Sequence, residues 1–147
     1  MAKINKSALV EYSASDMYSL VNDVAKYPEF VSGCRSAQVI TADDSSMTAQ
    51  LTIARAGIES CFTTHNRLLK DQSITMELAD GPFEYLTGKW QFIPLSESAS
   101  KVIFEVDFKF KSQLMDMAFS KVFKTTLESM VQAFVDRAKQ LGDKHES

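Results

Sequence analysis

The residues best suited to chemistry in this 147-residue chain are few and widely separated. Its two cysteines, Cys34 and Cys61, lack the close spacing of a zinc-binding pair, and two histidines are too few for a histidine-built metal centre. His65 is expected to face solvent from a strand, and neither a nucleophile elbow nor a glycine-rich phosphate loop occurs. We therefore predict no metal site, no required cofactor and no enzymatic activity.

A second group of residues suits the binding of phosphates. The segment 108–127 has one acidic residue, Asp116, and four lysines: Lys109, Lys111, Lys121 and Lys124. Such a patch either contacts a phosphate backbone or simply keeps an edge strand and a helix start solvated. No aromatic side chains are interleaved with these lysines, so we do not predict base-specific reading of RNA. The whole chain has a net charge of −3 and a pI of about 5.4, which argues against general DNA binding.

The largest set of candidate binding residues is apolar and alternates along the predicted strands. In the segment 101–111 the even positions are apolar, so one face of that strand is buried. The same phase along the other strands, together with a stripe of the C-terminal helix, predicts a pocket for a hydrophobic ligand, lined by Ala37, Val39, Leu51, Ile53, Phe62, Ile74, Met76, Leu78, Leu86, Trp90, Phe92, Phe104, Val106, Phe108, Phe119, Val122, Phe123 and Met130. A core filled by these side chains, without a void, is the alternative.

Two aromatic residues flank Pro28 in a predicted helical hinge over 24–32. Tyr27 and Phe30 are expected either to gate the pocket or to cap the core. Arg55 is expected either to meet a ligand head group or to pair with Glu59 at the rim.

These residues require a particular order of elements. A strand over 3–12 is followed by a helix over about 14–22, which Ser13 caps, and then by the hinge. Turns near residues 42–45, 56–57, 70–72, 80–82 and 96–98 divide 35–110 into six strands with short, antiparallel connections. The segment 112–141 lacks proline and glycine and predicts one amphipathic helix, with Leu114, Met117 and Ala118 on its buried stripe.

We therefore predict a single α+β domain over residues 1–147. An antiparallel sheet of about seven strands curls around the long C-terminal helix, in the order β-α-α-β6-α. The N-terminal residues lack the features of a signal or transit peptide, and no stretch is apolar enough to span a membrane. With two free thiols, a cytoplasmic location is expected.

Several short segments, taken together, resemble a known family over nearly the full length. They are Ala8-Leu9-Val10, Tyr12-Ser13-Ala14, Met17-Tyr18, Leu20 to Val24, Tyr27-Pro28, Gly33-Cys34, Asp80 to Phe83, Leu86, Gly88, Trp90, Phe92, Met130 to Phe134 and Arg137-Ala138. The chain resembles the START-like, helix-grip superfamily of polyketide cyclases, also called SRPBCC. Within it, the chain is similar to the branch of the coenzyme Q-binding proteins and the RatA family of ribosome association toxins.

The resemblance implies a non-enzymatic protein whose cavity binds ubiquinone and which supports cellular respiration. It also implies an alternative, in which the protein is a toxin that binds the large ribosomal subunit and blocks subunit association and translation initiation. The four lysines are the candidate ribosome contacts under that alternative, and the apolar lining with Tyr27 and Phe30 is the candidate ligand site.

Overall fold

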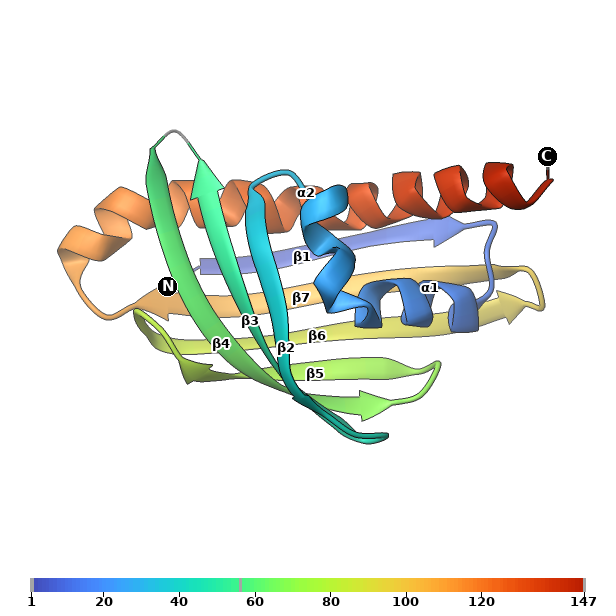
Figure 1. Ribbon diagram of the computed structural model, residues 1–147, viewed down its shortest axis with the longest axis horizontal. Helices are drawn as coiled ribbons and strands as arrows, with labels where there is room; N and C mark the ends of the chain where they lie inside the picture. The colour runs from blue at the N-terminus through green and yellow to red at the C-terminus, as the bar shows by residue number, and fades with distance from the viewer. Residues whose placement is uncertain (1, 56, 147) are drawn as a thin grey trace.

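The computed structural model describes the backbone of residues 2–55 and 57–146, with side chains through Gly142. Figure 1 shows one curved sheet, two short helical segments beside it and a long helix along it. The elements follow the predicted order: β1 (Ala2–Val10), α1 (Ala14–Asn22), η1 (Val24–Glu29), β2 (Cys34–Ala42), β3 (Ser46–Arg55), β4 (Ile58–Leu69), β5 (Ser73–Asp80), β6 (Phe83–Ser96), β7 (Ala99–Phe110) and α2 (Gln113–Glu146).

Within the described residues, seven strands form one antiparallel sheet in the order β1-β7-β6-β5-β4-β3-β2. Successive strands pair as hairpins because the connections between them are short. The first strand along the chain, β1, pairs with the last strand, β7, although all the other strands lie between them in the sequence. The predicted α+β fold, its antiparallel connections and the order of its elements along the chain are therefore confirmed.

Local signals account for most element boundaries. Ser13 accepts a hydrogen bond from the Asp16 amide at 3.0 Å, and α1 begins directly after this cap. The predicted turns lie between strands as expected, although Ala56 lies outside the described residues. The first strand ends at Val10 rather than at residue 12. The predicted hinge over 24–32 is a 3₁₀ helix from Val24 to Glu29, with Pro28 inside it.

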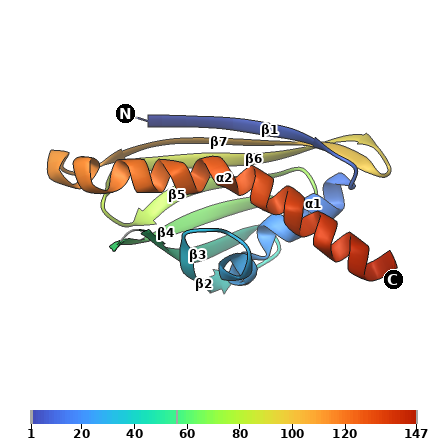
Figure 2. The same ribbon diagram turned by 90° about the horizontal axis from the view of Figure 1, so that it is seen from above.

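The sheet curls so that its concave face packs on α2, as Figure 2 shows from above. The Trp90 ring stacks on Phe104 at 4.0 Å between centroids and meets the edge of Phe134 from the helix at 5.2 Å. All three side chains are fully buried. The predicted inward phase of the strands is therefore confirmed at the centre of the sheet.

The long helix differs from the prediction at both ends. Leu114 and Met117 were expected in the core but are 76% and 78% exposed, and Ala118 is also exposed. The sheet ends before they can reach it, since β7 stops at Phe110 and the first turns of α2 extend past the strand ends (Figures 1 and 2). We call residues 113–121 the tip of α2. At the other end the helix continues through Gly142, which packs against Tyr12.

Candidate functional site

A small apolar cavity lies between the concave face of the sheet and the middle of α2. Its volume is about 50 Å³. A void of this size holds a few water molecules and is far too small for a polyprenyl quinone. Most of the interior therefore corresponds to the filled core given above as the alternative, with a small void remaining, because large aromatic side chains of the sheet and helix meet each other there.

The cavity brings together part of the predicted ligand site. The predicted residues that line it are Tyr27, Leu51, Phe62, Met76, Leu86, Trp90, Phe104, Val106, Phe123 and Met130. The other predicted residues do not line it: Phe30, Ala37, Val39, Ile53, Ile74, Leu78, Phe92, Phe108, Phe119 and Val122. Phe30 follows η1 outside the strands, whereas Ile53, Leu78 and Phe108 share the inward phase of the lining strand residues but lie nearer the ends of their strands. Phe108, for example, meets Phe83 and Phe123 edge-on.

One polar lining residue was missed by the sequence analysis. Thr64 stands two positions after Phe62, so the alternation that placed Phe62 inside also places Thr64 there. Its hydroxyl donates a hydrogen bond to Asn66 Oδ1 at 2.9 Å, and both residues are buried. The pair adds a polar spot to an otherwise apolar wall.

On β5 and β6, the cavity wall includes a glycine, Gly88, and a flexible methionine, Met76. Gly88 has no side chain, and the Met76 methyl group occupies the space above it: a Cβ on Gly88 would lie 2.6 Å from Met76 Cε. Methionine side chains are flexible and adapt to irregular neighbours. Met76 is therefore the side chain of this wall that is best able to change its position.

The predicted gate residues hold η1 firmly on the helix. The Tyr27, Phe30 and Phe134 rings contact one another edge-to-face, with centroids 5.2 to 6.3 Å apart. The Tyr27 hydroxyl donates a hydrogen bond to the Val21 carbonyl oxygen, and burial raises its pKa. Arg137 covers the Phe30 ring and pairs with Glu29 at 2.8 Å, so the segment is closed in this structure.

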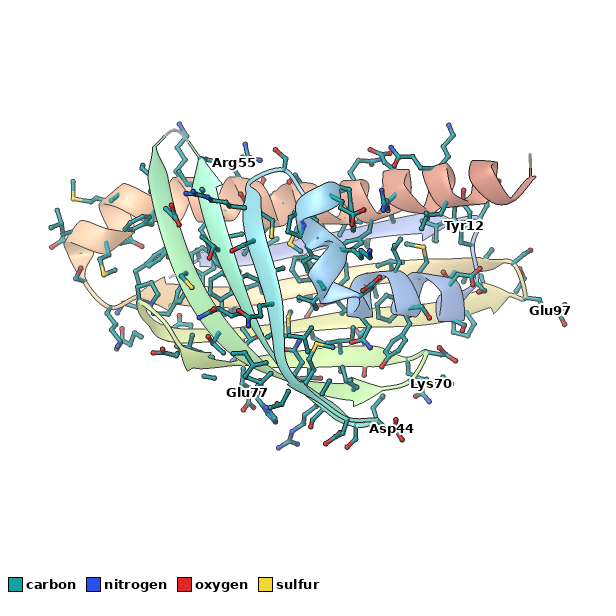
Figure 3. The ribbon with its side chains drawn as sticks, in the orientation of Figure 1. Tyr12, Asp44, Arg55, Lys70, Glu77 and Glu97 are labelled. Carbon is teal, nitrogen blue, oxygen red and sulfur yellow. The ribbon has the colours of Figure 1, made fainter. Side chains whose placement is uncertain are left out.

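Arg55 has a different partner from the one expected. Its Nε donates to Thr126 Oγ1 at 3.0 Å, and its terminal nitrogen donates to the Ser32 hydroxyl at 3.1 Å. Figure 3 shows Arg55 at the end of its strand, close to α2. Glu59 instead pairs with Arg35, at 2.7 Å. The sequence could not predict the contact between Arg55 and Thr126, because it depends on how α2 crosses the sheet.

The four candidate ribosome-contact lysines are all exposed. Lys109 pairs with Glu84 at 3.1 Å, and this carboxylate raises the pKa of Lys109. Lys124 lies 3.8 Å from Glu128 one helical turn on. Among the described residues Lys111 and Lys121 have no ion-pair partner, so their charges are available to an external anion.

The described part of the chain contains no cluster of three or more histidine, cysteine or acidic residues that could hold a metal ion. None of its helices is long and apolar enough to cross a membrane. Cys34 is buried and Cys61 exposed, and both are free thiols.

Comparison with known proteins finds relatives of this chain. The chain is 47% identical to "Ribosome association toxin RatA" of Escherichia coli (strain K12) over 141 residues, which cover 96% of this chain and 89% of that protein. It is 30% identical to "Coenzyme Q-binding protein COQ10, mitochondrial" of Drosophila melanogaster over 139 residues, 92% of this chain and 57% of that protein.

Solved structures share the fold. A START superfamily protein from Mycobacterium smegmatis matches with a TM-score of 0.78 at 21% identity, covering 95% of this chain and 98% of that one. The Zhui aromatase/cyclase from Streptomyces sp. R1128 matches with a TM-score of 0.83 at 13% identity, covering 95% and 94%. At these identities the likeness concerns the fold alone, which is the START-like, helix-grip fold.

The family model described as "Polyketide cyclase / dehydrase and lipid transport" matches residues 10–135. That range runs from the end of β1 through most of α2 and includes every residue that lines the cavity. The chain therefore belongs to the polyketide cyclase / dehydrase and lipid transport family, in the branch that contains the RatA and COQ10 proteins.

Proposed function

We propose that this protein binds the large ribosomal subunit and blocks its association with the small subunit, so that translation initiation stalls. The observation that carries the proposal is the 47% identity, over 96% of the chain, with a protein named a ribosome association toxin. The small volume of the cavity supports it, because the closed interior leaves the outer surface as the part of the molecule available for binding. Because this activity requires ribosomal subunits, we expect the protein to act in the cytoplasm.

The contact surface that we assign to the ribosome is the exposed lysine group at the start of α2 and the end of β7. Lys111 and Lys121 are free to meet phosphates, and Lys124 stands one turn further along the helix. Phosphate contacts of this kind recognise the shape and backbone of folded RNA rather than its sequence.

The test is a subunit-joining assay on a sucrose gradient. Added to salt-washed subunits, the protein is expected to deplete the joined particle and increase the free subunits. Replacing Lys121→Glu and Lys124→Glu together should abolish this effect, since two charges change sign at the contact surface.

A matched control changes the same charge elsewhere. Lys3→Glu with Lys89→Glu alters two exposed lysines on the outer face of the sheet, and this variant should deplete the joined particle as strongly as the unaltered protein. An unchanged gradient with the unaltered protein, or equal loss in both variants, contradicts the proposed contact.

A second candidate function is the binding of a hydrophobic ligand, for which ubiquinone is our expected example. The apolar character of the cavity lining favours it, because the interior has little polar surface to satisfy. Binding would require the cavity to enlarge, and the flexible Met76 side chain above Gly88 is where we expect that change to begin. Similarity to a protein named for coenzyme Q binding adds support. A role in cellular respiration would follow from such binding.

The ligand is tested by extraction. Protein purified from a quinone-containing host should release ubiquinone into organic solvent, detected by mass spectrometry. Gly88→Ala should reduce the amount, because the added methyl group presses on Met76, whereas Gly57→Ala, with nothing within 4 Å, should not. Extracts free of any lipid would reject this candidate.

Both candidate functions are forms of binding rather than catalysis, and we propose that the protein is not an enzyme. Among the lining residues of the described cavity, Tyr27 alone carries a titratable group. Its pKa is raised and its hydroxyl already donates to the main chain, which makes it a poor general base.

A further inference from the structure

The tip of α2 exposes an apolar pair that no other part of the described structure covers. Leu114 and Met117 are the two most exposed of the large hydrophobic residues, at 76% and 78%. They are three positions apart on the helix, and the exposed Ala118 follows directly, so the three share one side of the first turns. Figures 1 and 2 both show these turns beyond the ends of the strands.

Positive charge surrounds this pair. Lys121 continues the same helix side at the seventh position after Leu114, and Lys111 precedes the helix. Both are exposed and unpaired among the described residues. Asp116 is the single acidic residue between positions 109 and 127. The tip therefore presents a small apolar side with a basic border.

We infer that the tip of α2 docks this protein onto the surface of an anionic phospholipid bilayer. A bilayer interface accepts apolar side chains just below its headgroups and attracts lysines to its phosphates, so it satisfies both features at once. Folded RNA would satisfy the lysines but leave Leu114 and Met117 uncovered. A second copy of this chain would bring like charges together around the apolar pair. The inference goes beyond the proposed action on ribosomes.

A continuous apolar path joins the tip to the cavity. Phe119 lies at the end of the tip and contacts Phe110, with ring centroids 6.1 Å apart. Phe110 in turn contacts Phe123 at 6.0 Å, and Phe123 lines the cavity. Docking by the tip would therefore place the bilayer at the aromatic end of the interior.

The inference is tested by co-sedimentation with lipid vesicles. The full chain should sediment with vesicles of phosphatidylglycerol mixed with phosphatidylcholine, and much less with phosphatidylcholine alone. Added salt should weaken the binding. Lys111→Gln and Lys121→Gln should each weaken it by about fivefold. Leu114→Glu with Met117→Glu should abolish it.

A control at the opposite end of the molecule separates docking from general stickiness. Leu9 and Leu95, 73% and 56% exposed, lie where β1 and β6 end, and Leu9→Glu with Leu95→Glu should leave vesicle binding unchanged. Circular dichroism should show that both double variants remain folded, as expected for substitutions at exposed positions.

Three results would overturn the inference. They are no sedimentation of the unaltered protein, equal binding to neutral vesicles, and equal loss in the two double variants. If the Leu114→Glu/Met117→Glu variant instead loses only the effect on ribosomal subunits, the tip belongs to the ribosome contact and the bilayer inference is wrong. If vesicles bind while the gradient is unchanged, the proposed function fails and this inference stands.

Discussion

The middle of α2 and its tip belong to one uninterrupted helix, yet they meet opposite environments. From Phe123 to Ala138 the helix buries a regular stripe against the sheet, whereas Leu114 and Met117 in the tip lie in solvent. Both parts show the same helical spacing of apolar residues. The difference is one of reach, because a helix of 34 residues spans roughly 50 Å and outruns the strands beneath it.

The two parts of the helix therefore have different roles. The middle of the helix closes the interior: Phe134 touches the gate residues Tyr27 and Phe30 as well as Trp90. In the tip, Leu114 and Met117 contribute little to the fold and are available to an external partner. Substitutions in the two parts should therefore affect different measurements.

The sharpest contrast is expected between Phe134→Ala and Met117→Ala. Loss of the fully buried Phe134 ring should lower the free energy of unfolding by about 3–5 kcal/mol, because it leaves a cavity among three aromatic side chains. Met117→Ala should change it by less than about 0.5 kcal/mol. Urea denaturation of both variants measures the difference, and similar losses would show that the tip packs against the fold after all.

The next largest effect concerns Gly33, which places the loop after η1 against the middle of α2. Its φ is +89°, and a Cβ would lie 2.7 Å from Thr126 Oγ1. Gly33→Ala should lower the free energy of unfolding by about 1–3 kcal/mol. Gly57→Ala is the control, since its φ is +80° but nothing lies within 4 Å. Equal losses would mean that backbone strain alone, and not contact with the helix, limits this position.

Alkaline pH should lower the free energy of unfolding through the buried Cys34 thiol, which lies in the core and not in the tip of α2. Burial raises the pKa of the Cys34 thiol from 9.0 to about 11. The folded state holds this proton more tightly than the unfolded chain does. The contribution of Cys34 to the free energy of unfolding is therefore fully present below pH 9.0, and the free energy of unfolding falls by about 1–2 kcal/mol as the pH rises toward 11. Thermal unfolding across this range measures the loss, and Cys34→Ala should flatten it. An unchanged slope in that variant would assign the loss to other groups.

The smallest expected effect comes from the ion pair that ties η1 to the helix. Glu29→Gln removes the charge opposite Arg137 and should lower the free energy of unfolding by less than about 1 kcal/mol, because Glu29 is half exposed. Arg137 keeps its contact with the Phe30 ring. A larger loss would indicate that the pair, rather than the aromatic contacts, keeps the segment closed.

Patterns that depend on near neighbours in the chain were predictable. Ser13 and Asp16 mark the start of α1, and the alternation over 101–111 identifies the buried face of β7, because capping and pleating act within a few residues. The hairpin turns follow for the same reason. Most of the cavity lining follows from extending that alternation to the other strands.

Features that depend on distances between elements were decided by the folded structure alone. The sequence cannot tell where the sheet stops beneath the helix, so Leu114 and Met117 look like core residues until the strand ends are known. It cannot choose between Thr126 and Glu59 as partners of Arg55, since that depends on how α2 crosses the sheet. It also cannot give the volume of the cavity, because packing of large side chains from several elements determines how much space remains.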